Sequence, residues 1–280
     1  NGIRTDGVFF SGQSFITKLS SGIAALISSA VFGYVGYSGA NVDKLNDALH
    51  AGADFLTYDG GTGPGTLTAA AMVGLYFSPE RMQPGDIGNL AARIVALTHG
   101  DPLAFLPGAM VAHLVCRCLR DHTTPLRTLV EEAIKALDDQ FGRQYRQTAQ
   151  VIAAVRQALK YVDNYDIFPV DAMEKLKCDT GADILAGAIY ASLIYERDFD
   201  SAMIVAVNHS GRSAAVGALA GAILGARLGQ EALPEFYLES LEVGKTLTEL
   251  AVDLTQAKQT LSIFDDSWDQ KYVQGMPAHI

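Results

Sequence analysis

The sequence predicts an all-α fold in a single compact domain over residues 1–280. Runs of alternating apolar and polar residues between hairpin turns, which are typical of strands, are absent from it. Many segments instead place apolar residues three and four positions apart, the repeat of a helix with one buried face. The chain has 280 residues, 49% of them hydrophobic, and no low-complexity linker divides it. One sizeable helical core is therefore the expected architecture.

Expected helices follow one another along the whole chain, with short breaks between them. Their bounds are 14–36, 41–55, 66–77, 85–99, 102–119, 125–138, 143–163, 169–176, 180–196, 198–206, 212–228 and 233–262. Prolines near helix starts or stops mark many breaks, because proline suits the first turn of a helix and not its interior. They are Pro79, Pro102, Pro107, Pro125, Pro169 and Pro234. Asp101 is expected to cap the helix that starts at Pro102.

Composition and charge exclude several classes of function. The formal net charge is −10 and no basic run is present, so we expect no nucleic-acid or membrane partner. The uncharged stretch 19–42 has its apolar residues on one face and is expected to be a buried helix. The chain begins without the apolar region of a secretory signal. Three cysteines without paired spacing, Cys116, Cys118 and Cys178, indicate core thiols and a cytoplasmic protein.

A stripe of glycines marks the expected helix 212–228. Gly217, Gly221, Gly225 and Gly229 are four residues apart and share one face. Such a stripe favours the close approach of a neighbouring backbone, which would hold this helix rigidly. Its N-terminus would then be well placed, and a helix N-terminus attracts anions and polar ligands.

The polar run Asn208–Ser213 joins two apolar helices and is the main candidate site. A capping loop, with Ser210 or Ser213 as the cap, is one interpretation. Capping alone does not account for asparagine, histidine and arginine together, so a role facing a ligand is favoured. His209 titrates near neutral pH and suits acid–base chemistry, and Arg212 suits a phosphate, carboxylate or carbonyl. Because Ser210 follows His209, a Ser–His arrangement stays open.

A second candidate is the glycine-rich loop Gly60–Thr66. It lacks the lysine of a phosphate-binding P-loop and has no strand before it. A backbone nest that holds a polar group is the remaining interpretation.

Several ordered segments resemble the ADP-ribosylglycohydrolase family, especially its bacterial branch. The clearest is DFDSAMIVAVNHSGRSAAVGALAGAILGARLG at 198–229. The others are GPGTLTAAAMVGLYF at 63–77, ALTHGDPLAFLPGA at 96–109, GADILAGAIYASLIY at 181–195, and the segment 267–272. The resemblance implies an all-α fold with two magnesium ions in a central cleft. It also implies cleavage of the glycosidic bond of ADP-ribose attached to a protein or small molecule.

Compared with the family's motifs, this sequence differs at several positions, among them those where the resemblance implies magnesium-binding aspartates. Arg212 and Ala214 stand where the resemblance places two aspartates, and Thr68 and Ala69 replace a Met-Arg pair. Near the start, Ser11–Ser14 matches the family's aspartate pair with Gly12 and Gln13 at its acidic positions, although Asp6 is a competing match. Ala182 replaces one glutamate, while Asp183 keeps an acid. A guanidinium in place of carboxylates adds positive charge, so we expect no magnesium pair and no other cofactor.

The sequence therefore predicts a family member that has lost the metal site, with the family's hydrolysis absent or very slow. The favoured hypothesis is a metal-independent lyase, cyclase or isomerase acting on a small, partly apolar molecule. Its expected catalytic residues are His209, Arg212 and Asp183. The expected ligand-binding residues are Asn208, Ser210, Ser213, Gly63, Gly65, Thr66, Thr68, Gln13 and Ser14.

Two alternatives to this metal-independent enzyme stay open. One is a non-catalytic protein that binds ADP-ribose or a nucleotide, and the other is a structural protein like the lens crystallins of this family. A small molecule is the expected partner in the first two cases. The oligomeric state, monomer or homodimer, is left open.

Overall fold

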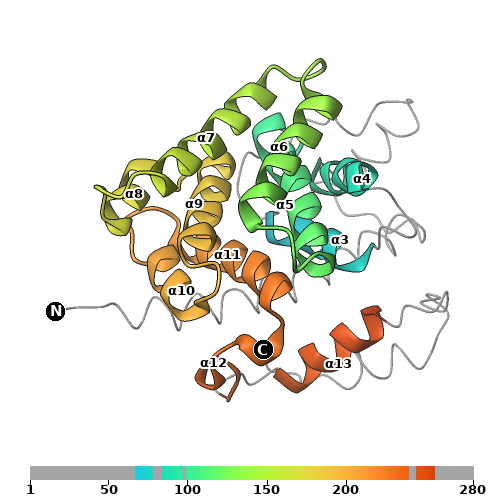
Figure 1. Ribbon diagram of the computed structural model, residues 1–280. Helices are drawn as coiled ribbons and strands as arrows, with labels where there is room; N and C mark the ends of the chain where they lie inside the picture. Colours follow the sequence, from blue (N-terminus) through green and yellow to red (C-terminus); the bar gives the residue numbers. More distant parts are fainter. Residues whose placement is uncertain (1–66, 78–83, 97–98, 240–243, 256–280) are drawn as a thin grey trace, which may run out of the picture.

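The computed structural model describes residues 67–77, 84–96, 99–239 and 244–255, and within these ranges every regular element is helical (Figure 1). The elements are α3 (Leu67–Tyr76), α4 (Pro84–Ala96), α5 (Pro102–Arg120), α6 (Leu126–Phe141), α7 (Gln147–Val162), α8 (Pro169–Leu176), α9 (Gly181–Ile194), α10 (Phe199–Val207), α11 (Ser213–Leu228), η3 (Gln230–Ala232), α12 (Glu235–Glu239) and α13 (Gly244–Thr255). The all-α prediction is confirmed. The helices expected at 14–36 and 41–55 lie outside the described residues.

The central element of the fold is α5. It packs against α3, α4, α6 and α11, and its inner residues from Ala104 to Cys116 are buried. By length and composition α5 is the one described helix that could cross a membrane. However, 78% of its apolar stretch is buried inside the protein. Such burial is typical of a core helix. The three cysteines are free and buried, as expected of core thiols.

The helix α5 begins with the expected cap, but it continues through a proline that was expected to mark a break. Asp101 is the N-cap and accepts a hydrogen bond from the Leu103 amide at 2.7 Å, with Pro102 in the first turn. Pro107, expected at a break, lies inside the helix. This expectation was wrong because α5 is packed tightly in the core. Its contacts there keep the helix continuous although Pro107 has no backbone N–H to donate.

A second group of helices places the candidate site. The helix α9 lies between α7 and α11, and α10 packs against both α9 and α11 (Figure 1). Both α9 and α11 are apolar on nearly all faces, as their buried residues show, which fits helices enclosed by others. This packing brings the α8–α9 connection and the α10–α11 connection to the same end of the group.

The helix expected over 233–262 falls partly on residues 240–243 and 256–262, which lie outside the described residues. In the rest of this range the structure describes α12 and α13, and η3 precedes them. The ring of Tyr237 in α12 stacks edge-on against Phe199 of α10, and its hydroxyl donates to Asp200 at 2.8 Å. Docking onto α10 sets the direction of α12, and the helical spacing of apolar residues carries no information about this contact.

Two glycines of the stripe in α11, Gly221 and Gly225, meet no neighbouring backbone among the described residues. Within the part of the chain that the structure describes, a Cβ at Gly225 would meet nothing within 4 Å, and one at Gly221 would make an ordinary contact with Met203 at 3.8 Å. A far closer approach occurs at Gly74 of α3, against the Ala112 carbonyl of α5. Four-residue spacing defines a face of a helix, but only the packing decides which face meets another backbone.

Candidate functional site

The candidate site consists of two loops in direct contact, residues 177–180 between α8 and α9 and residues 208–212 between α10 and α11. The amide of Arg212 donates to the Cys178 carbonyl oxygen at 2.9 Å. A Cβ added at Gly211 would lie 2.9 Å from both the Cβ and the carbonyl oxygen of Cys178. We call these residues the paired loops. Only glycine at position 211 allows the loops to approach this closely.

The first of the paired loops has an unusual backbone. Lys177 and Cys178, with φ of 62° and 49°, are the only non-glycine residues with positive φ among those described. Such angles are costly for residues with a Cβ. The Cys178 side chain is fully buried, and this burial, with smaller contributions from Asp183 and Glu174, raises the pKa of its thiol to about 12. The thiol is therefore a packed core group rather than a nucleophile.

Ser210 of the second loop is bound to Glu174 of α8. Its amide donates to Oε1 at 2.8 Å, and its hydroxyl donates to Oε2. These two hydrogen bonds lower the pKa of Glu174. The hydroxyl thus pairs with a carboxylate and not with His209, so the structure contains no Ser–His pair here. Sequence reasoning missed Glu174, since no local pattern connects it with a residue 36 positions away.

The ring of His209 has a backbone partner at each nitrogen. Nδ1 accepts from the Gly211 amide at 3.1 Å, and Nε2 lies 3.0 Å from the Ala206 carbonyl oxygen. Nε2 therefore carries the proton of the neutral ring. Burial lowers the pKa of His209, which favours this neutral form. Beside it, Asn208 Nδ2 donates to the Ile204 carbonyl at 2.6 Å, so both side chains bind carbonyls in the last turn of α10.

Arg212 lies at the surface, with 57% of its side chain exposed. Its Nε donates to the backbone carbonyl of Asp179 at 3.1 Å and to the Asp179 carboxylate at 3.2 Å. Asp179 is a second residue that sequence reasoning missed. The guanidinium of Arg212 therefore points toward the first loop and forms an ion pair there.

The N-cap of α11 differs from the expected one. Arg212 occupies the N-cap position and makes no side-chain capping bond, while Ser213 is the first helical residue and its amide donates to the Gly211 carbonyl at 2.8 Å. The expectation that Ser210 or Ser213 caps this helix was wrong, because Ser210 is turned toward Glu174 and Ser213 already lies inside the first turn.

Asp183 lies in the first turn of α9 and forms a reciprocal capping box with Thr180. The Asp183 carboxylate accepts from the Thr180 amide at 3.2 Å, and the Thr180 hydroxyl accepts from the Asp183 amide at 3.3 Å. The structure thus brings Asp183, His209, Ser210 and Arg212 together around the paired loops, each with a partner from the protein itself.

The other expected ligand-binding residues are not part of the paired loops as described. Thr68 is buried in the first turn of α3, with 5% of its surface exposed. The remaining residues of this set, Gln13, Ser14, Gly63, Gly65 and Thr66, lie outside the described residues.

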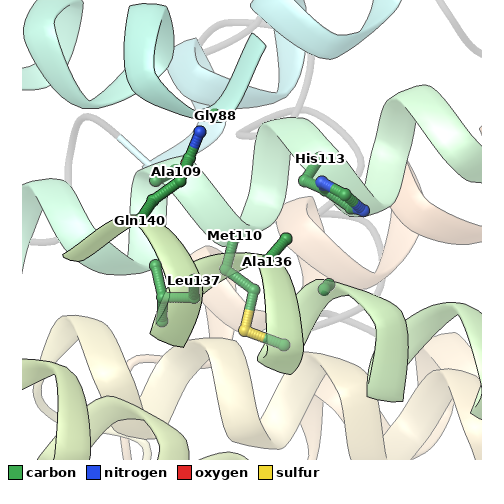
Figure 2. A pocket seen from close by; sticks show the side chains of 8 residues that line it. Gly88, Ala109, Met110, His113, Ala136, Leu137 and Gln140 are labelled. Atoms are coloured by element: carbon green, nitrogen blue, oxygen red, sulfur yellow. The ribbon is translucent and has the colours of Figure 1, made fainter. Parts of the chain in front are cut away.

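A separate small hollow lies between α4, α5 and α6. Figure 2 shows Gln140 and His113 among the side chains around it, with Met110 and Leu137 nearby. Gln140 Nε2, at one side of the hollow, donates to the Gly85 carbonyl oxygen of α4. It has room for about one water molecule, which is too small for an organic ligand.

Comparisons with known proteins agree with the resemblance seen in the motifs. The family model described as ADP-ribosylglycohydrolase matches residues 13–262, a span that includes every described residue. No match was found among curated proteins.

Proposed function

This chain belongs to the ADP-ribosylglycohydrolase family, and we propose that it is a member that has lost the family's dinuclear magnesium site. The observation that carries the proposal is the ion pair between Arg212 and Asp179. A permanent cation occupies the position where the resemblance places an aspartate, and a neighbouring carboxylate is engaged by that cation. A magnesium ion here would meet a like charge in place of a ligand.

The side chains of the paired loops do not form a ligand set for magnesium. Magnesium takes oxygen ligands in octahedral geometry. The side chain of Arg212 has only N–H groups, which donate hydrogen bonds and cannot bind a cation, and the side chain of Ala214 has no polar group. The carboxylates of Asp179, Asp183 and Glu174 are each bound to a guanidinium, an amide or a hydroxyl. The described residues contain no group of three or more His, Cys, Asp or Glu that could hold a metal ion.

The retained function that we propose is binding of an ADP-ribose-type anion without hydrolysis. An acid–base catalyst needs a ring nitrogen or carboxylate within reach of the substrate proton. In this chain His209 is held by backbone groups at both nitrogens, and Asp183 completes a capping box. Arg212 keeps further N–H donors beyond the Nε used on Asp179, and a guanidinium is well suited to phosphate oxygens.

The competing hypothesis is the metal-independent lyase, cyclase or isomerase. It requires His209 to give up a backbone hydrogen bond so that one nitrogen can exchange a proton with the substrate. A purely structural protein, the third hypothesis, would bind no small molecule at all. The three hypotheses therefore differ in binding and turnover with the same ligand.

Titration calorimetry with ADP-ribose, in excess magnesium and in EDTA, tests the proposal. We expect equal affinity in both buffers and a loss of about tenfold or more in Arg212→Ala, the scale of one lost charge-assisted contact. Arg127→Ala is the matched control, since Arg127 also forms an exposed ion pair, with Asp163 at 2.7 Å. Its affinity should equal that of the wild type.

Three outcomes would contradict the proposal. Magnesium-dependent release of ADP-ribose from an ADP-ribosylated peptide would show that the metal site is retained. Absence of ADP-ribose binding in both buffers would exclude the binding function and leave the structural hypothesis. Equal affinity of Arg212→Ala and the wild type would exclude Arg212 as the anion-binding group.

A further inference from the structure

The two backbone partners of the His209 ring are of opposite kinds. Nδ1 accepts from the Gly211 amide at 3.1 Å, and Nε2 lies 3.0 Å from the Ala206 carbonyl oxygen. A carbonyl can accept from the ring in either protonation state. An amide N–H can only donate, so it requires a ring nitrogen that carries no proton. The arrangement therefore fits a neutral histidine and does not fit an imidazolium ion.

Protonation of His209 would place a ring N–H group opposite the N–H of Gly211. Rotating the ring by half a turn brings no relief, because both nitrogens of an imidazolium carry a proton. Burial is the main influence on the pKa of His209 and lowers it, while the Ala206 carbonyl and the Glu174 carboxylate act in the opposite direction. A protonated ring must therefore leave its place at the end of α10, or Gly211 must turn away from it.

The charged groups at this end of the neighbouring helices do not remove the conflict. The helix α10 packs against α8, α9 and α11. From α8, Glu174 favours protonation of the ring. From α9, Asp183 is held in its capping box, and at the start of α11, Arg212 is paired with Asp179. The carboxylate of Glu174 limits the fall in the pKa of the ring, but the atom that faces Nδ1 is still an amide nitrogen.

Gly211 is also the point at which the paired loops meet. A Cβ there would lie 2.9 Å from the Cys178 carbonyl oxygen, and the amide of the next residue, Arg212, donates to the same oxygen at 2.9 Å. Turning Gly211 away from the ring would displace the Arg212 amide from this acceptor. The hydrogen bond to His209 therefore helps to keep the two loops together.

We propose that His209 is an acid-sensitive latch of the paired loops: protonation of its Nδ1 breaks the hydrogen bond from Gly211 and separates the loops. The folded ring takes up a proton less readily than a histidine in the unfolded chain, whose pKa is about 6.5. Folding stability should therefore fall as the pH decreases from about 6.5 toward the lowered pKa of the folded ring. Because Arg212 lies in the second loop, acid should also weaken anion binding, a consequence that rests on the proposed function.

Hydrogen exchange of single amides, followed by NMR, tests the latch without any ligand. In the wild type, the protection factor of the Arg212 amide should fall by about tenfold or more between about pH 7.5 and about pH 5. In His209→Gln the side-chain oxygen can still accept from Gly211 but does not titrate, so the fall should be less than about twofold. The Asp198 amide, which donates to the Tyr195 carbonyl at 3.0 Å in another connection, is the internal control and should keep its protection.

His122→Gln is the matched control variant. His122 lies in the connection between α5 and α6, and its Nδ1 lies 2.9 Å from the Arg227 carbonyl oxygen. This partner is an acceptor, which suits a ring in either protonation state. The variant should therefore keep the full response of the Arg212 amide to acid.

Two results would overturn the latch: equal protection of the wild-type Arg212 amide at both pH values, or an equal fall in the wild type and in His209→Gln. Calorimetry with ADP-ribose at the same two pH values measures the consequence for binding. The wild type should bind several-fold more weakly at about pH 5, and His209→Gln should bind equally at both. Absence of binding at either pH, together with the expected response of the amide, would reject the proposed function and leave the latch.

Discussion

Gly211 lies where the paired loops approach each other most closely. A Cβ at this position would press on the backbone of Lys177 and on Cys178, neither of which is the free end of a flexible side chain. Relief would require the loops to separate, which would weaken the hydrogen bond from Arg212 to the Cys178 carbonyl. At the scale of single residues, position 211 is therefore the place in the site where a side chain would be tolerated least.

We expect Gly211→Ala to lower the free energy of unfolding by about 1–3 kcal/mol, the usual cost of forcing extra volume into a packed position. Urea denaturation measures the effect. The matched control is Gly225→Ala in α11, where a Cβ meets no atom of the described residues within 4 Å. This control should be neutral or stabilising by up to about 1 kcal/mol, because alanine favours a helix more than glycine does. Equal stability of Gly211→Ala and the wild type would mean that the loops are not tightly paired.

At the scale of elements, Asp183 has a structural role at the start of α9. Its carboxylate binds the Thr180 amide in a capping box, a structural role that accounts for an acid at this position without any catalysis. The same carboxylate lies close enough to Cys178 to contribute to the raised pKa of that thiol. A stability measurement separates the capping role from a role in ligand binding.

Thr180→Ala and Asp183→Ala should each destabilise the protein by about 1 kcal/mol, as expected for loss of a helix cap. The double variant should cost less than the sum, because both residues act in one reciprocal motif. Thermal denaturation of the two single variants and the double variant tests this. If Asp183→Ala leaves stability unchanged but abolishes ADP-ribose binding, the carboxylate serves the ligand and the structural interpretation fails.

At the scale of the whole molecule, Arg227 connects segments far apart in the sequence. It lies in the last turn of α11, its side chain is only 8% exposed, and it pairs with Glu196 at 2.9 Å. Its guanidinium also donates to the Asp121 and Thr124 carbonyls in the connection between α5 and α6. One side chain thus joins the end of α11, the residues after α9 and the end of α5.

Arg227→Met should lower the free energy of unfolding by about 3 kcal/mol, since it leaves the Asp121 and Thr124 carbonyls without their donor and leaves Glu196 with only the Leu126 amide. Chemical denaturation gives the value. Arg127→Met provides the comparison, because the Arg127–Asp163 pair is well exposed and should contribute about 1 kcal/mol or less. A cost for Arg227→Met no larger than that of the comparison would argue against Arg227 as a connection between the helices.

Local chemistry in the sequence determined the helices and several of their ends. The segment 169–176 was expected from its periodicity and from Pro169, and α8 has the same bounds. Asp101 before Pro102 was expected to begin a helix, and it does. These features could be predicted because a helix and its caps depend on residues within one or two turns of each other. The ordered motifs likewise identified the family over most of the chain.

Only the tertiary structure decided the partners of the site residues. Asp179 for Arg212, and Glu174 for Ser210, come from another loop and another helix, 33 and 36 positions away. The backbone bonds of His209 were also invisible in the sequence, and they tie its ring to the end of α10 and to the loop that follows. The sequence by itself therefore determined which residues could form the site. The packing of α8 to α11 determined what each of them binds, because contacts between distant segments depend on how helices pack and not on their spacing.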